Sequence, residues 1–363
     1  MRRVLELDQL SLYEQPHSGP ARVLVCSTPA SRGLLTDPVS CGLGYRRTLR
    51  TALAQAMQAL VAADVADLAS MPDGAVAVLN VLRGGLSFGV EDAVSQILGL
   101  DPMVSFVGTE RLPDRPVELS YARWELGSAR TLMVGDIIGT GATLTRALSN
   151  ALELAASQHR PLQSILIFTI GSRLGIERVA SLLASWPPAA RPAVTIVALE
   201  ALYELPVPGN PAAFPWYPFD LLRWPANSAP EYELERLRKV GSLFERCAIY
   251  DGGVRAFTPA EHAESRRKWW AEVLDRGVPL AELAGRTAGL ANYRLPLAQW
   301  AQTISWAQAI SQAQQPGLDV AAVHDLGRQA LQFAEHTDTA DYVRSFRIGA
   351  DSLVEHDPVA GRS

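Results

Sequence analysis

Short apolar runs alternate with amphipathic segments over the first two thirds of the chain. Six runs have the length and apolar content of strands, at residues 22–26, 75–82, 104–108, 131–134, 164–171 and 194–199. Between them, apolar residues recur with a period of about 3.6, which predicts helices at 45–68, 90–98, 144–157 and 176–186. Strands that alternate with helices predict an α/β fold, with a mostly parallel sheet flanked by helices.

The pattern changes near Leu205. Residues 205–227 contain six prolines and a cluster of aromatic residues, and only helical patterns follow. Residues 228–231 and 258–261 each combine a hydroxyl residue, an early proline and a glutamate at the fourth position, which is typical of a capped helix start.

We expect the helix that starts near residue 258 to stop at Gly277, and further helices at 296–314, 319–335 and 339–348. The chain is therefore predicted to comprise an α/β domain at 1–205, a Pro- and aromatic-rich connector at 206–227 and an all-helical C-terminal domain at 228–363.

Composition and charge exclude several classes of protein. The chain has 363 residues, of which 48% are hydrophobic and 20% charged, so it is not a disordered chain. The net charge of −5 argues against non-specific electrostatic binding of nucleic acid. No run reaches the roughly 20 apolar residues of a membrane-spanning helix. Cys26, Cys41 and Cys247 have no CxxC spacing, which argues against a disulfide framework and a zinc site. We expect a cytoplasmic protein with no nucleic-acid or membrane partner.

One segment, Thr131–Leu144, combines a strand, an acid and a small-residue loop. Its apolar strand is followed by a single carboxylate, Asp136, and then by the loop Gly-Thr-Gly-Ala-Thr at 139–143, which opens into a helix. Backbone N–H groups at a helix N-terminus favour an anion, and glycines allow it to approach closely. The segment therefore predicts a phosphate-binding loop, with an ordinary strand-to-helix turn as the alternative. It lacks the lysine of GxxxxGK[ST] and the spacing of GxGxxG.

This pattern resembles the phosphoribosyl-pyrophosphate (PRPP) motif of type I phosphoribosyltransferases. Two further segments occur in the family's order. Residues 78–86, Val-Leu-Asn-Val-Leu-Arg-Gly-Gly-Leu, resemble its pyrophosphate loop, in the form found in uracil phosphoribosyltransferases. Residues 106–121 stand where that family has its mobile catalytic loop. The resemblance covers about residues 30–205.

The resemblance implies transfer of ribose 5-phosphate from PRPP to an unidentified nucleobase or base-like acceptor, with release of pyrophosphate. It implies Mg²⁺ as cofactor, held through PRPP with Asp136 as candidate protein contact, and a homodimer is the usual oligomer. Three residues are the candidates for catalysis: Asp136, Arg83 and Arg111. The candidates for PRPP binding are Gly84, Gly85, Gly135, Asp136, Gly139, Thr140, Gly141, Ala142 and Thr143. A solvated loop would also explain Arg111.

Two departures from the family pattern keep a second function open. The motif usually has two adjacent acidic residues, and the first is replaced by Gly135. The second Asp of hypoxanthine-guanine enzymes is replaced by Gly139, and no uracil-binding loop follows Leu199. The acceptor is therefore not assigned, and a non-catalytic PRPP or nucleotide sensor on the same fold is the alternative.

A third hypothesis comes from Gly85–Gly89, which matches the GxSxG pattern of serine hydrolases. No histidine lies between His159 and His262, where a catalytic partner would be expected. We therefore favour Ser87 as a helix N-cap. Residues 266–270 mix basic and aromatic side chains, and we interpret them as one buried and one solvated face of a helix.

Overall fold

The computed structural model describes residues 1–17, 19–110, 116–205, 225–239, 241, 244, 252–287 and 320–345. Within these residues the strands form one sheet of ten strands, in the order β1-β2-β3-β9-β8-β7-β4-β5-β6, with β10 paired to β9. The strands are β1 (Arg2–Leu7), β2 (Leu10–Gln15), β3 (Arg22–Ser27), β4 (Val76–Leu82), β5 (Met103–Glu110), β6 (Glu118–Arg123), β7 (Thr131–Ile138), β8 (Ser164–Ser172), β9 (Ala193–Tyr203) and β10 (Pro225–Ser228).

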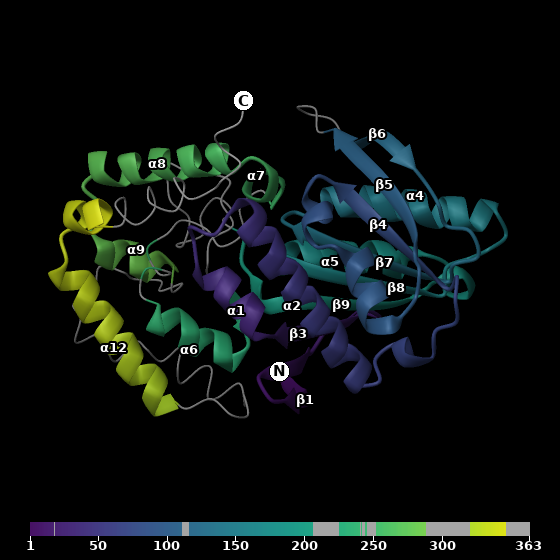
Figure 1. Cartoon of the computed structure of the whole chain (residues 1–363), viewed down its shortest axis with the longest axis horizontal. Helices are drawn as coiled ribbons and strands as arrows, with labels where there is room; N and C mark the ends of the chain where they lie inside the picture. The colour runs from purple at the N-terminus through teal and green to yellow at the C-terminus, as the bar shows by residue number, and fades with distance from the viewer. Residues whose placement is uncertain are drawn as a thin grey trace.

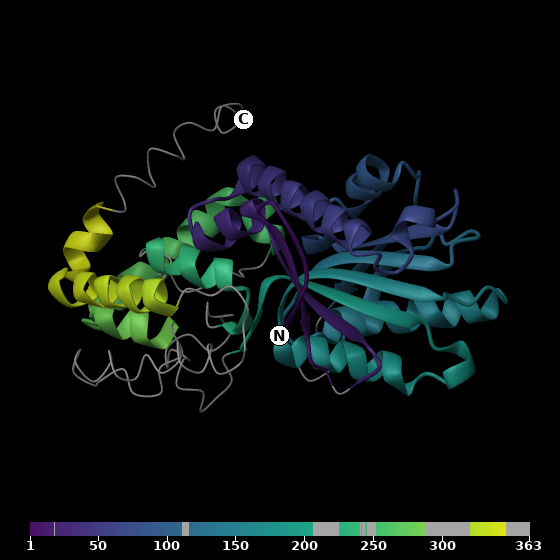
Figure 2. The ribbon, with the colours of Figure 1, turned by 90° about the horizontal axis from the view of Figure 1, so that it is seen from below.

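The described helices lie on both sides of the sheet and in a separate C-terminal group (Figure 1). They are α1 (Pro29–Thr36), α2 (Gly42–Ala62), α3 (Val90–Ala93), α4 (Ala142–Ser157), α5 (Arg173–Ser185), α6 (Pro230–Arg238), α7 (Gly252–Phe257), α8 (Pro259–Asp275), α9 (Leu280–Thr287) and α12 (Val320–His336). Short 3₁₀ or π turns stand at η1 (Leu68–Ser70), η2 (Gly84–Ser87), η3 (Val94–Leu98) and η4 (Pro188–Ala190). Figure 2 shows α2 on one face of the sheet and α4 and α5 on the other.

The order of the central strands reverses between β4 and β7. Strands β5, β4, β7, β8 and β9 lie side by side and pair in parallel. Numbered along the chain, this is the doubly wound order 2-1-3-4-5. The carboxyl ends of β4 and β7 therefore meet at a topological switch point, the place where open α/β sheets usually bind ligands. The α/β class and the mostly parallel sheet are thus confirmed, with antiparallel strands at β1, β2, β6 and β10.

All six predicted strands are present, and two of them continue at least four residues beyond their predicted ends. The strand predicted at 131–134 continues to Ile138, and the one predicted at 194–199 continues to Tyr203. Four strands were not predicted: β1, β2, β6 and β10. In β6, Glu118–Arg123, nearly all residues are exposed, so the segment has no apolar run to reveal it. The helix predicted at 45–68 starts earlier and ends earlier, at Gly42–Ala62.

The helical C-terminal part packs against α1 and α2. In Figure 1, helices α6, α8, α9 and α12 lie on the side of α1, away from β5 and β6. Arg255 of α7 is 1% exposed and donates hydrogen bonds to the carbonyl oxygens of Ser40 (2.6 Å) and Asp37 (2.7 Å). Its guanidinium also lies over the ring of Tyr45. These contacts bind the helical part to the loop that precedes α2.

Two predicted helix starts hold, but their caps differ from the prediction. Ser228 belongs to β10, and its hydroxyl contacts the Glu233 carboxylate, so it does not cap α6. Thr258 precedes α8 as predicted, but its hydroxyl donates to Glu261 (3.0 Å) and to a backbone carbonyl instead of capping an N–H group. Neither α6 nor α8 has a side-chain hydrogen bond to a first-turn amide.

The later helices agree with the prediction where they are described. Helix α8 stops at Asp275, and Gly277 follows with φ +61°. Helix α12 and a helical stretch at 339–345 match two predicted helices, whereas the predicted helix 296–314 lies outside the described residues. Trp269 and Val273 form the buried face of α8, but Arg266, expected in solvent, is 7% exposed. In the described part of the chain, no helix is long and apolar enough to cross a membrane.

Candidate functional site

The predicted phosphate loop connects the carboxyl end of β7 to α4. Gly141 is the N-cap of α4, with φ +76° and no side-chain cap. The amides of the first helical residues, Ala142, Thr143 and Leu144, have no acceptor within the helix. Residues Gly139, Thr140, Ala142 and Thr143 are all partly exposed. The loop therefore presents backbone donors and two hydroxyl groups at a helix N-terminus.

The glycine at position 141 is needed for two reasons. Its positive φ is a conformation that other residues rarely adopt. In addition, a Cβ there would lie 2.6 Å from the carbonyl oxygen of Gly175 in α5. Gly141 therefore lets the loop pack directly on the backbone of the next helix.

The second predicted loop, η2, follows β4 and lies against the end of β7. Arg83, which precedes η2, is exposed, and the peptide bond between Leu82 and Arg83 is cis. A Cβ on Gly85 would lie 3.0 Å from the carbonyl oxygen of Gly135. A side chain at position 85 would push η2 away from β7, so the glycine keeps η2 against this strand.

Asp136 lies between the two loops. It is 8% exposed, and its Oδ1 accepts a hydrogen bond from the Ile137 amide at 2.8 Å. The Cβ position of Gly84 lies 3.1 Å from the same Oδ1 atom. The structure therefore brings Gly84 and Gly85, which follow Arg83 in the chain, together with Gly135 and Asp136, and the 139–143 loop continues from the same strand.

Gly135 has a packing role that the sequence did not indicate. A Cβ at this position would lie 2.5 Å from the Cβ of Phe88 and 2.8 Å from Cγ2 of Val90. Phe88 is fully buried. The space for a second acidic side chain is thus filled by an aromatic residue that follows η2, and Asp136 stands without an acidic neighbour in the strand.

Ser87 has neither of the roles considered from the sequence. It is fully buried, and its hydroxyl donates to the carbonyl oxygen of Gly84 at 2.6 Å. The N-cap of α3 is Gly89, with φ +61°, so the prediction of Ser87 as the cap is wrong. A buried hydroxyl that is bonded to its own turn is not placed as the nucleophile of a GxSxG hydrolase.

The predicted mobile loop at 106–121 is largely a hairpin. Strands β5 and β6 pair up to Glu110 and Glu118. Arg111, the third candidate for catalysis, lies outside the described residues. Tyr121 is 49% exposed on the edge strand β6.

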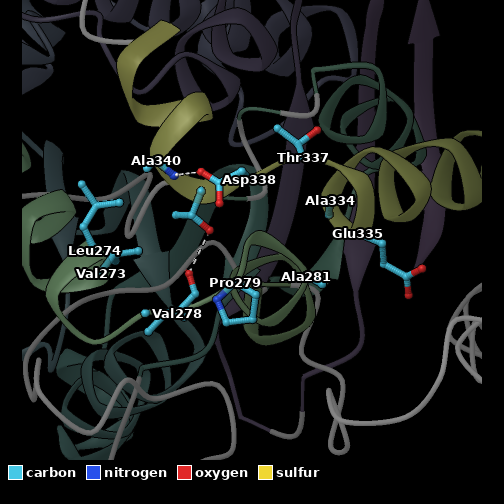
Figure 3. Close-up of a pocket in the computed structure, with 12 residues that line it drawn as sticks. Val273, Leu274, Val278, Pro279, Ala281, Ala334, Glu335, Thr337, Asp338 and Ala340 are labelled. Atoms are coloured by element: carbon cyan, nitrogen blue, oxygen red, sulfur yellow. Dashed lines mark hydrogen bonds between the residues drawn. The ribbon is translucent and has the colours of Figure 1, made fainter.

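A separate hollow lies in the helical part. It has a volume of about 450 Å³ and is bordered by α8, α9 and the end of α12. Figure 3 shows the residues that line it. Two of its polar residues are hydrogen-bonded within the protein: Thr339 donates to the Val278 carbonyl at 3.0 Å, and Asp338 accepts from the Ala340 amide at 2.9 Å. None of the predicted site residues lines this hollow.

Comparisons with known proteins show only a distant likeness. No protein-family model matches the chain, and no curated protein matches it. A similar solved structure is an adenine phosphoribosyl transferase from Trypanosoma brucei in complex with AMP, pyrophosphate and ribose-5-phosphate. The match has 12% sequence identity and a TM-score of 0.31, and covers 52% of this chain and 86% of that chain. A TM-score this low does not assign the chain to a family.

Proposed function

We propose that the chain is a PRPP-dependent phosphoribosyltransferase, which transfers ribose 5-phosphate to a nucleobase or base-like acceptor and releases pyrophosphate. The observation that carries the proposal is the approach of two glycine-containing loops on either side of one carboxylate, with the Cβ position of Gly84 3.1 Å from Asp136 Oδ1. A ribose that carries phosphate groups at two ends needs this arrangement of two anion sites with a hydroxyl acceptor between them.

Each loop has a distinct role in this proposal. The amides and hydroxyl groups of residues 139–143 bind the 5′-phosphate, because a helix N-terminus favours an anion. The amides of Gly84 and Gly85 and the guanidinium of Arg83 bind the pyrophosphate, for which Arg offers a fork of donors. Asp136 accepts hydrogen bonds from the ribose hydroxyls.

In the reaction, an acceptor nitrogen forms a bond to ribose C1′ while the bond from C1′ to the pyrophosphate oxygen breaks. The electron pair of that bond leaves with pyrophosphate, and positive charge develops at C1′. Arg83 stabilises the charge on the leaving group, and Asp136 lies near the positive ribose. Positioning and charge stabilisation thus supply most of the rate acceleration.

The residues fit a Mg²⁺ ion that arrives with PRPP. Mg²⁺ is usually bound through one or two carboxylates plus substrate phosphates and water. Within the described residues, no three His, Cys, Asp or Glu side chains are grouped as metal ligands. Asp136 is then the candidate protein contact, and the ion would neutralise part of the phosphate charge.

A PRPP or nucleotide sensor without catalysis is the second candidate function. The packing of Phe88 against Gly135 favours it, because Phe88 fills the space of a second carboxylate that would help to hold charge at C1′. The identity of the acceptor, the homodimer and the cytoplasmic location stay predictions.

Calorimetric titration with PRPP and Mg²⁺, followed by a pyrophosphate-release assay, tests both candidates. The assay screens purines, pyrimidines and orotate as acceptors. PRPP binding with base-dependent release supports the transferase, and binding without release by any base favours the sensor. Absence of PRPP binding overturns both.

An Asp136→Asn variant tests whether PRPP binds at Asp136. Hydrogen bonds to a charged group contribute about 1.5–3 kcal/mol, so we expect PRPP affinity to fall by about 10- to 100-fold. Asp92→Asn is the control, because Asp92 is an exposed carboxylate of α3 that pairs with Arg50. Equal affinities in the two variants would assign Asp136 a structural role only.

A further inference from the structure

Helix α5 contacts the carbonyl side of the phosphate loop. Ser172, the N-cap of α5, donates from its hydroxyl to the carbonyl oxygen of Gly139 at 2.5 Å. Arg178 donates from Nη1 to the carbonyl oxygen of Thr140 at 3.1 Å. Since side chains on a helix lean toward its N-terminus, Arg178 can reach the loop although it lies almost two turns into α5.

Gly175 lies between these two residues and closes the contact. A Cβ on Gly175 would collide with the carbonyl oxygen of Gly139, and a Cβ on Gly141 would lie 2.6 Å from the Gly175 carbonyl oxygen. Ser172, Gly175 and Arg178 are spaced at three-residue intervals, so they share one face of the helix. This face holds the loop backbone directly.

The contact fixes the direction of two loop amides. In a trans peptide the C=O and the following N–H point in opposite directions. The Gly139 carbonyl and the Thr140 amide share one peptide unit, and the Thr140 carbonyl and the Gly141 amide share the next. Because both carbonyls point at α5, both amides point away from it. They add to the first-turn amides of α4 as donors for an anion.

We propose that Ser172 and Arg178 are positioning residues, which hold the two carbonyls so that the Thr140 and Gly141 amides stay directed at the 5′-phosphate of the ligand. The inference rests on the proposed function, since it requires a sugar phosphate in this loop. In this proposal α5 does not contact the ligand. It supports the loop that does.

Ribose 5-phosphate and inorganic pyrophosphate are the probes that test it, titrated by calorimetry into the full-length protein. Ser172→Ala and Arg178→Ala should each weaken ribose 5-phosphate binding by about tenfold, the effect of losing one modest hydrogen-bonded constraint. Pyrophosphate affinity should stay within about twofold. Arg178→Lys should restore most of the ribose 5-phosphate affinity, because its ammonium group can donate to the same carbonyl. A merely structural loss would weaken both ligands together.

Arg173→Ala is the matched control. It removes the same charge from the same helix, but Arg173 pairs with Glu204 and Glu177. If Arg173→Ala weakens ribose 5-phosphate as much as Arg178→Ala, general electrostatics is responsible and the inference is overturned. Unchanged binding in Arg178→Ala overturns this inference but leaves the proposed function standing. If Ser172→Ala does not fold, Arg178→Ala still decides the test. A parent protein that binds neither probe overturns the proposed function and the inference together.

Discussion

Phe88 occupies the space that a side chain at position 135 would need. The Cβ position of Gly135 is 2.5 Å from Phe88 Cβ, and both residues are buried. Gly135 belongs to β7, which leads to the phosphate loop, and Phe88 follows η2. The packing of these two residues therefore fixes one loop against the other, and it excludes the second carboxylate of the family pattern by shape.

This packing predicts strong coupling between the two positions. Gly135→Ala overpacks the core and should lower the free energy of unfolding by about 1–3 kcal/mol. Phe88→Gly should lower it by at least about 3–5 kcal/mol, because it leaves a cavity. Glycine also lacks the Cβ that would lie 2.5 Å from a Cβ at position 135. In the double variant of Gly135→Ala and Phe88→Gly the added methyl group enters the vacated space, so the combined loss should be smaller than the sum by about 0.5–3 kcal/mol.

Urea unfolding of the parent and the three variants measures the coupling. Gly33→Ala is the control, because a Cβ on Gly33 in α1 meets no atom within 4 Å. Additive losses in the double variant would show that Phe88 does not exclude a side chain at position 135.

A methyl group at position 84 should interfere with the pyrophosphate site. Its Cβ would lie 3.1 Å from Asp136 Oδ1, between the carboxylate and the η2 backbone. We expect Gly84→Ala to weaken pyrophosphate binding by about tenfold or more, comparable to the loss of one charge-assisted hydrogen bond. Gly44→Ala in α2 has open space around its Cβ and should bind as the parent does. Calorimetry with pyrophosphate compares the two, and equal affinities would remove η2 from the site.

Glu200 should make stability depend on pH. It is fully buried in β9, where its Oε1 accepts from the Thr28 amide at 2.8 Å. Burial raises the pKa of Glu200 from 4.5 to about 7, and the hydrogen bond from Ser31 opposes this only in part. Between pH 4.5 and 7 the folded state therefore holds a proton that the unfolded state has lost.

The sign of the effect follows from this proton. The stabilisation is complete below the unfolded pKa and is lost as pH rises through the folded pKa near 7, at no more than about 1.4 kcal/mol per pH unit. Glu200→Gln removes the titration, so its unfolding free energy should fall less steeply than that of the parent between pH 5 and 7. Urea unfolding at several pH values measures the slopes. Glu153→Gln, at an exposed position of α4, is the control, and equal slopes for Glu200→Gln and the parent would contradict the prediction.

Arg255 should be essential for the attachment of the helical part. Arg255→Met keeps an apolar stem but leaves the carbonyls of Ser40 and Asp37 without their donor. We expect a loss of about 2–4 kcal/mol in unfolding free energy, because buried acceptors remain unsatisfied. Arg267→Met removes an exposed ion pair with Glu264 and should cost less than about 1 kcal/mol. Thermal unfolding compares them, and similar melting temperatures would show that other contacts hold the helices.

The local sequence was sufficient for the central strands and for the glycine-containing loop at 139–143 that opens α4. Asp136 and the loop at 139–143 follow an apolar run and open a helix, and these signals are all read within one short segment. Five of the six apolar runs are buried on both faces of the mostly parallel sheet, where an uninterrupted run is required, whereas β5 is partly exposed. The division into domains at 205 and 228 stays a prediction.

Signals that depend on the choice of hydrogen-bond partner were less reliable. Ser87 and Ser228 each precede a helix in sequence, but their hydroxyl groups bond to Gly84 and Glu233. Gly84 and Glu233 lie close to these serines in the chain. Both serines are buried in the fold, and there their hydroxyl groups bond to these partners instead of to helix amides. The edge strand β6 was missed because nearly all of its residues are exposed and no apolar run marks it.

Only the tertiary structure explained the glycines of the site. Sequence alone indicated that position 135 has a glycine where the resembling pattern has an acidic residue. The fold showed that Phe88 fills the space that an acidic side chain would need. Sequence also indicated that Gly141 opens a helix, whereas the fold showed that Gly175 requires it. Such contacts join segments that are far apart in the sequence and meet only in the folded sheet. Residue type and spacing therefore indicate which loops are candidates for binding an anion. The packing of each loop against its neighbours decides where the loop's N–H donors point.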